Sequence, residues 1–218
     1  RRQTKLVKTN LPLFQHFEDL RNHPTWKVKA ILMMVVTLIH AFLLKIDTDN
    51  TTLLEGFGYS KQDIEEFHQI HWFADTMSSL MGVLISFLFT FVVFMMFSKL
   101  LHSDVSAQTI LSASFSHSLI VTTVALVFVC IQLIFHLPFP TYNITSLNIF
   151  LPGNMYLAAF DVQTIFKGYV TFIVYYATSR LSLRAALTLG LLTIALTILL
   201  ALGSAALEDT ILSLAGEL

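Results

Sequence analysis

Four side chains able to bind a metal ion recur at helical spacing in an acidic stretch before the second long apolar segment. Glu65, His68, His71 and Asp75 are separated by three or four residues, so a helix would place them on one face. Imidazole and carboxylate groups are ligands of zinc and of other divalent cations. No further ligand stands at motif spacing, and no His-Glu-x-x-His motif occurs. We therefore favour the alternative that these residues form the polar face of a helix at the membrane surface.

Four other polar side chains stand in or near long apolar segments: Asp161, Lys167, His40 and His117. Charged groups are costly within a bilayer, and they usually face the interior of a helical bundle or water. They are candidates for a transport or proton-relay role, although a structural hydrogen bond between helices is the favoured explanation. Asp161 and Lys167 are six residues apart and do not share a helical face. Asp161 lies near the outer end of its segment, where we expect it to cap or pair.

Small residues at helical spacing occur in two apolar segments and predict close packing between helices, within the protein or with a partner. The two sets are Ser78, Ser79 and Gly82, and Ala201, Ser204 and Ala205. Cys130, the only cysteine, lies in an apolar run and is interpreted as a buried hydrophobic residue. Because no nucleophile elbow, Walker loop or dinucleotide fingerprint is present, we predict neither an enzyme nor a bound cofactor.

The composition is that of an integral membrane protein. The chain has 218 residues, of which 55% are hydrophobic and 12% charged, and its mean hydropathy is +0.71. Soluble domains carry about 25% charged residues, so this chain has too little polar surface to face water on all sides. The net charge of -1 provides no basic footprint for nucleic acid. We predict a multi-pass protein of the cell membrane, surrounded by the lipid bilayer.

Five apolar segments are long enough to cross the roughly 30 Å hydrocarbon core as helices, which need about 20 residues each. They predict an all-α membrane domain over 26–218, with spans at about 26–44, 77–101, 110–135, 155–177 and 181–202. Residues 1–25 form a separate polar and basic segment in which Leu13, Phe17 and Leu20 recur at helical spacing. This pattern is typical of an amphipathic helix on the membrane surface, or equally of a terminal helix docked on the protein.

The basic residues predict the orientation of the chain. Ten of the 13 Lys and Arg residues fall before the first span or at the connections that follow the second and fourth spans. Cytoplasmic loops carry an excess of these residues, so we expect the N-terminal segment in the cytoplasm and the C-terminus outside. The outer loops are then longer than the inner loops, and they contain the Asn-x-Thr glycosylation sequences at Asn50 and Asn143.

Short motifs spread over the chain add a resemblance to a known family. They are Leu11–Phe17, His23–Trp26 before the first span, Phe160–Phe166 in the fourth span, and the basic hinge Ser179–Arg184. Together they resemble bacterial members of the Yip family of integral membrane proteins, over nearly the whole chain. The resemblance implies a five-span helical scaffold with an outer C-terminus and no catalytic residue. Some bacterial members of that family look like accessory subunits of ABC-type exporters, which implies a membrane-protein partner.

These observations lead to one main hypothesis and two alternatives. The main hypothesis is a non-enzymatic membrane scaffold or accessory subunit that assembles with another membrane protein, or with itself as a homo-oligomer. The first alternative is a small transporter or channel subunit, which requires a water-accessible cavity containing at least two of Asp161, Lys167, His40 and His117. The second alternative is a metal-dependent membrane enzyme that uses the Glu65, His68, His71 and Asp75 face on the outer side of the membrane.

Overall fold

The computed structural model describes residues 10–47, 60–137, 139 and 141–216, and at 45–47, 61–76, 79 and 211–216 it describes the backbone alone. Its only β feature in this part of the chain is an isolated bridge between Ser146 and Asp161, so the predicted all-α class is confirmed. The main helices are α1 (Phe14–Asn22), α2 (Lys27–Asp47), α4 (Lys61–Leu100), α5 (Ala107–Ile134), α7 (Val162–Ile173) and α8 (Leu183–Gly216). Shorter elements are the 3-10 helix η1 (Leu147–Phe150), the turn α6 (Met155–Ala158) and the π-helical turn η2 (Val174–Thr178).

Four of these helices are long and apolar enough to cross a membrane. Their apolar stretches are Lys27–Leu44, Leu80–Leu100, Ala107–Ile134 and Leu183–Thr210. These ranges correspond to the first, second, third and fifth predicted spans. Both α4, with 40 residues, and α8, with 34, exceed the roughly 20 residues that the hydrocarbon requires. The chain therefore continues as helix before the predicted second span and beyond the predicted fifth.

The predicted fourth span over 155–177 is not one continuous helix, and this prediction needs correction. The turn α6 ends at Ala158, and the helix restarts at Val162 after Asp161, whose backbone is extended. Aspartate competes with helical hydrogen bonding through its side chain and so favours a cap over a helix interior. With η2, the restarted helix contains 17 residues, from 12 and 5, which is short for a span. All five residues of η2 are buried in the bundle.

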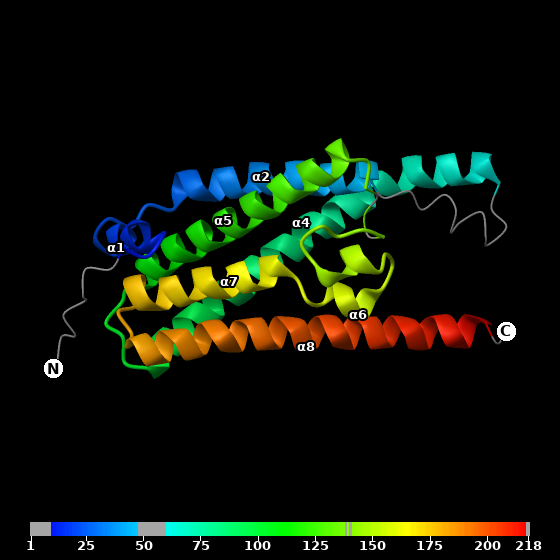
Figure 1. The fold of residues 1–218 in the computed structure, drawn as a ribbon. Helices are drawn as coiled ribbons and strands as arrows, with labels where there is room; N and C mark the ends of the chain where they lie inside the picture. The colour runs from blue at the N-terminus through cyan, green and yellow to red at the C-terminus, as the bar shows by residue number, and fades with distance from the viewer. Residues whose placement is uncertain (1–9, 48–59, 138, 140, 217–218) are drawn as a thin grey trace.

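Successive helices run in opposite directions along a common long axis (Figure 1). The start of α2, the end of α4, the start of α5, the end of η2 and the start of α8 gather near α1 at one end. Basic residues cluster at this end because they flank those helix termini: Lys27, Lys29, Lys99, Arg180 and Arg184. The structure thus has one basic end, and α6 with η1 covers part of the other.

Two glycines allow α7 and α8 to cross closely. A Cβ atom placed on Gly168 would lie 2.3 Å from Ile194 Cγ1, and one on Gly190 would lie 2.8 Å from the Gly168 carbonyl oxygen. Both distances are too short for real carbon contacts, so a larger residue at either position would push the helices apart. This glycine pair makes a close helix approach within the described bundle.

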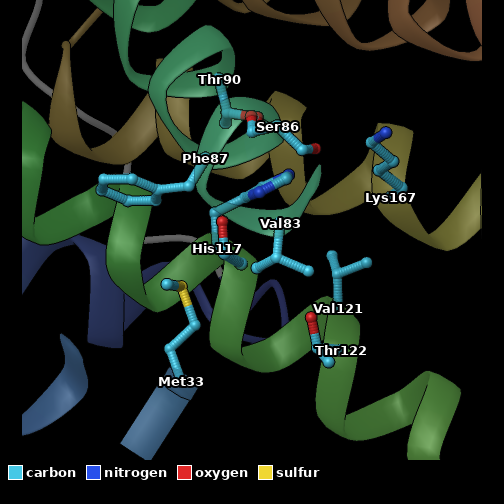
Figure 2. Close-up of a pocket in the computed structure, with 10 residues that line it drawn as sticks. Met33, Val83, Ser86, Phe87, Thr90, His117, Val121, Thr122 and Lys167 are labelled. Carbon is cyan, nitrogen blue, oxygen red and sulfur yellow. The ribbon is translucent and has the colours of Figure 1, made fainter. Parts of the chain in front are cut away.

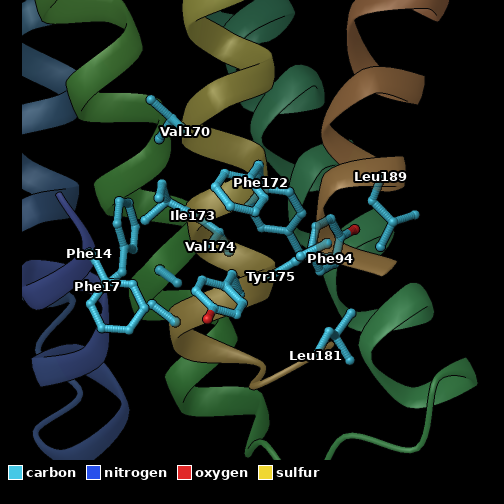
Figure 3. Packing of buried hydrophobic residues seen from close by; sticks show 14 of the residues in the cluster. Phe14, Phe17, Phe94, Val170, Phe172, Ile173, Val174, Tyr175, Leu181 and Leu189 are labelled. Carbon is cyan, nitrogen blue, oxygen red and sulfur yellow. The ribbon is translucent and has the colours of Figure 1, made fainter. Parts of the chain in front are cut away.

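The helix α1 is docked on the bundle, as one of the two interpretations of segment 1–25 proposed. Phe14, Phe17 and Leu20 are buried in the same hydrophobic cluster as Tyr175 and its neighbours in η2. Figure 3 labels Phe14, Phe17 and Tyr175 in this cluster. Hydrogen bonds also join α1 to η2. The Thr178 hydroxyl donates to the Phe17 carbonyl at 3.0 Å. Arg21 donates to the Thr178 carbonyl at 2.6 Å and also pairs with Asp104 on the loop after α4.

Candidate functional site

A polar cavity of about 130 Å³ lies between α4, α5 and α7, with Met33 of α2 at its border (Figure 2). It opens at the surface of the bundle beside the exposed Ser86, and it is large enough to hold several water molecules. The polar side chains that line it are Ser86, Thr90, His117, Ser118, Thr122 and Lys167. The cavity therefore joins one cation, one imidazole and four hydroxyl groups from three helices.

Helical periodicity positions these side chains on the cavity. On α4, Ser86 and Thr90 are four residues apart, and on α5, Ser118 and Thr122 repeat that spacing. Residues four apart share a helical face, so each helix presents two hydroxyls to the same space. The Thr90 hydroxyl donates to the Ser86 carbonyl at 2.9 Å, which satisfies its own proton and leaves the oxygen as an acceptor.

His117 is the most buried polar residue of the cavity, with 3% of its surface exposed. Its Nε2 atom lies 3.1 Å from the Thr171 hydroxyl oxygen on α7. The ring packs edge-on against Phe94, with 5.2 Å between the ring centroids. The Nδ1 atom has no hydrogen-bond partner in the described part of the chain, although the backbone of Lys167 lies near the ring. A buried nitrogen without a partner is costly, so water or a ligand in the cavity would stabilise it.

Lys167 brings a positive charge to the same space from α7. Figure 2 shows its ammonium group on the same side of the cavity as the Ser86 hydroxyl and the His117 ring. Among the described residues the only ion pair joins Arg21 and Asp104, so Lys167 has no carboxylate partner there. No carboxylate stands among the described residues that line the cavity. An ammonium group within a membrane-spanning bundle is costly, so the lining hydroxyl groups, together with water or an anion, would have to solvate it.

Two of the four predicted intramembrane polar residues thus meet in one cavity, and two do not. His40 lies half-buried on α2, away from the cavity lining. Asp161 is the N-cap of α7, and its Oδ1 atom accepts from the Gln163 backbone N–H at 2.7 Å. The expected capping role of Asp161 is therefore present in the structure.

Asp161 also anchors a polar network that covers the non-basic end of α7. The Asn143 side-chain amide donates to Asp161 Oδ2 at 3.1 Å, and the Thr145 hydroxyl donates to Asn143 Oδ1 at 2.7 Å. The Gln163 amide donates to the Thr145 hydroxyl at 2.9 Å. The Asn143 of the predicted glycosylation sequence thus has both side-chain atoms engaged within the protein.

The remaining predicted sites stay outside this arrangement. Glu65, His68, His71 and Asp75 fall in the part of α4 whose side chains lie outside the described residues. Within the described side chains, no three His, Cys, Asp or Glu residues come close enough together to hold a metal ion.

The predicted small-residue sets have different surroundings. In the first set, Gly82 has open space where a Cβ would stand, and Ser78 is exposed. In the second set, Ser204 is exposed, Ala201 is half-buried and Ala205 is buried. Gly203, next to Ser204 on α8, also has open space where a Cβ would stand. Ser79 lies outside the described side chains.

Sequence reasoning singled out His117 and Lys167 but missed their hydroxyl neighbours. The available signal was the repeated four-residue spacing of Ser86 with Thr90 and of Ser118 with Thr122. Serine and threonine are common on the faces of membrane helices, so this spacing alone does not show which two helices pack together. Taken together, the site can bind and orient a small polar or anionic molecule. No protein-family model, curated protein or solved structure matches this chain.

Proposed function

We propose that this chain is a small membrane transporter or transport subunit that binds an anionic solute within the bilayer. The observation that carries the proposal is the cavity shared by His117 and Lys167. The transporter hypothesis requires a cavity that contains at least two of the four predicted polar residues, and this cavity contains His117 and Lys167. Ionisable residues inside a membrane bundle are rare, and they often mark solute or ion pathways.

The preference for an anion follows from the charges of the lining. Among the described residues that line the cavity, Lys167 is the only charged one, and the hydroxyls of Ser86, Ser118 and Thr122 line the same space and can donate hydrogen bonds. A hydrogen bond between an ammonium and an anion is about twice as strong as one between neutral groups. A cation would instead meet the positive charge of Lys167 with no carboxylate to offset it. The volume of about 130 Å³ limits the solute to a small anion.

Cysteine labelling tests whether water reaches the cavity. The single native cysteine allows a cysteine-free Cys130→Ala background, into which Thr90→Cys or Thr122→Cys is introduced. We expect charged, membrane-impermeant thiosulfonate reagents to modify both positions, because these reagents require a hydrated thiolate. The matched controls are Phe89→Cys on α4 and Val127→Cys on α5, whose apolar side chains are 68% and 52% exposed and where we expect lipid contact. Equal labelling of cavity and lipid positions would contradict an aqueous cavity.

A second experiment tests the preference for an anion. Chloride, nitrate and formate are added separately to the purified full chain in uncharged detergent, and the thermal unfolding midpoint is recorded. A ligand that binds the folded state raises the midpoint. We expect at least one anion to do so in the native chain and in Lys167→Arg, and none in Lys167→Gln. An unchanged response in Lys167→Gln would contradict anion binding at this residue.

A second candidate function is the non-enzymatic scaffold or accessory subunit, and the unused small residues favour it. Gly82 on α4 and Gly203 on α8 have open space beside their backbones and contact no other described helix closely. Small exposed residues permit a partner helix to approach. The Yip-like motifs support the same function, with an ABC-type exporter as the candidate partner.

The scaffold function predicts a stable complex. A tagged full-length chain purified in mild detergent would retain a membrane-protein partner, or a second copy, at fixed stoichiometry. Gly82→Leu and Gly203→Leu would weaken that complex while leaving the fold intact, because neither position has an internal neighbour. A monomer without any partner would count against this function.

A further inference from the structure

A second cavity, distinct from the one at Lys167, lies where α1, α2 and α5 meet near the basic end. Its volume is about 310 Å³, and its lining comprises Leu13, His16, Lys29, Ser116, Leu119 and Ile120. The leucine and isoleucine side chains form apolar walls, while the two basic side chains and one hydroxyl provide its polar groups. This combination of an apolar groove and a basic group is amphipathic, like a phospholipid.

The polar groups of this groove carry an uncompensated positive charge. Lys29 donates one hydrogen bond, to the Thr25 hydroxyl at 3.3 Å, and has no ion pair within the described residues. His16 Nε2 lies 3.3 Å from the Ser116 hydroxyl oxygen. Burial and the charge of Lys29 lower the pKa of His16, and Asp19 on the same helix opposes them with a weaker effect. The positive field of Lys29 therefore exceeds the negative field of Asp19 at the imidazole.

The depth of the groove corresponds to the boundary between headgroups and hydrocarbon. Lys29 belongs to the first turn of α2, three residues after Trp26, whose ring stacks on Phe115 with 6.1 Å between centroids. Tryptophan is enriched at the membrane interface, and long basic side chains reach from helix ends to the headgroups. Leu119 and Ile120 lie one turn further into the bundle along α5 than Ser116. The polar groups thus face the interface and the apolar walls continue inward.

We propose that this groove binds one anionic phospholipid, with its phosphate at Lys29 and His16 and an acyl chain along Leu119 and Ile120. The N-terminal residues 1–9 of the same chain are a poorer occupant. Residues 1–9 contain four basic side chains and no carboxylate, so Lys29 would repel them. Those residues would instead add to the attraction for an acidic lipid surface, to which each Lys or Arg contributes about 1 kcal/mol.

Native mass spectrometry of the full chain, purified in uncharged detergent, tests the proposal. The lipids compared are phosphatidylglycerol and phosphatidylcholine with identical acyl chains. We expect one phosphatidylglycerol to be retained in preference to phosphatidylcholine. Lys29→Gln should lower that affinity about tenfold, as loss of a charge-assisted hydrogen bond does, and Lys29→Arg should preserve it. The matched control is Lys27→Gln, an exposed basic residue of the same turn that does not line the groove.

A variant of the apolar wall and a phosphate competition complete the test. Ile120→Trp keeps the wall apolar but fills the groove, so the retained phosphatidylglycerol should be lost while the folded chain remains. Equal retention of the two lipids, or an unchanged affinity in Lys29→Gln, would overturn the proposal. Binding of inorganic phosphate alone with the same dependence on Lys29 would also overturn it, because the occupant would then be a free anion.

Discussion

His117 is held by one hydrogen bond and one aromatic contact, while its second ring nitrogen, Nδ1, has no hydrogen-bond partner among the described residues, although the Lys167 backbone lies near the ring. Thr171 therefore has two effects at once. It provides the hydrogen-bond partner of His117 Nε2, and by holding the ring it fixes the direction in which Nδ1 points. The same hydrogen bond joins α5 to α7, so it belongs both to the site and to the helix packing.

Replacing Thr171 with valine tests this role. Thr171→Val preserves the shape of the side chain but removes the hydrogen-bond partner of His117 Nε2. We expect the free energy of unfolding to fall by about 1–3 kcal/mol, the penalty for an unsatisfied buried polar group. Denaturant unfolding in detergent measures it. Thr171→Ser keeps the hydroxyl and should lose less stability, and a fully stable Thr171→Val would mean that the hydrogen bond contributes nothing.

The helices pack through a few positions where the side chain cannot be enlarged. The crossing of α7 and α8 depends on Gly168 and Gly190, whereas Gly203 further along α8 has open space around it. The two α8 glycines look alike in the sequence, because both stand in leucine- and alanine-rich helix. Only the neighbouring α7 distinguishes them.

Alanine substitutions on α8 should therefore separate packing from helix propensity. Alanine stabilises a helix by about 1 kcal/mol relative to glycine. At Gly190 the added methyl group would meet the Gly168 carbonyl, so Gly190→Ala should instead destabilise the protein by about 1–3 kcal/mol. Gly203→Ala, with free space, should be neutral or stabilising. Thermal unfolding in detergent compares them, and equal effects at the two sites would contradict the close crossing.

The docking of α1 should depend on pH through His16. Burial and Lys29 hold the pKa of its imidazole below the ordinary value of 6.5, so the docked state binds a proton less readily than the undocked state. Docking is then strongest above pH 6.5 and weakens as the pH falls below it. In lipid-free detergent, proteolysis within α1 should accelerate from about pH 7.5 to about 5.5. His16→Gln should remove this dependence, and an identical pH profile in that variant would assign it to another group.

At the scale of the whole molecule, the number of membrane crossings decides where the C-terminus lies. Four helices have the length of a span, and the shorter α7 with η2 runs alongside them in the bundle (Figure 1). We propose that this shorter helix also completes a crossing, with burial by its neighbours and the polar network at Asp161 protecting its ends. The basic end would then face the cytoplasm, according to the positive-inside rule.

Reporter fusions to the two termini test this topology. A fluorescent protein at the N-terminus should fluoresce, because it folds in the cytoplasm, and alkaline phosphatase at the C-terminus should be active, because it requires the outer compartment. Five crossings place the termini on opposite sides. If the helix at 162–178 does not cross, both termini lie on the same side and the C-terminal phosphatase is inactive.

The sequence by itself determined the membrane class and the four long helices, because runs of apolar residues need no tertiary partner to be recognised. It also indicated His117 and Lys167, since polar groups stand out against an apolar background. It failed at 155–177, where continuous hydropathy hid the break that Asp161 makes as an N-cap. Hydropathy measures side-chain solubility and does not report where the backbone leaves the helix.

Only the tertiary structure decided which polar residues meet and which small residues pack. His117 and Lys167 are 50 residues apart (167 minus 117) and come together because α5 and α7 lie side by side, whereas His40 lies away from them. The docked position of α1 was equally undecided until Phe14, Phe17 and Leu20 were found buried against η2. An amphipathic face has the same residue pattern whether lipid or protein covers it, so its sequence alone cannot distinguish the two.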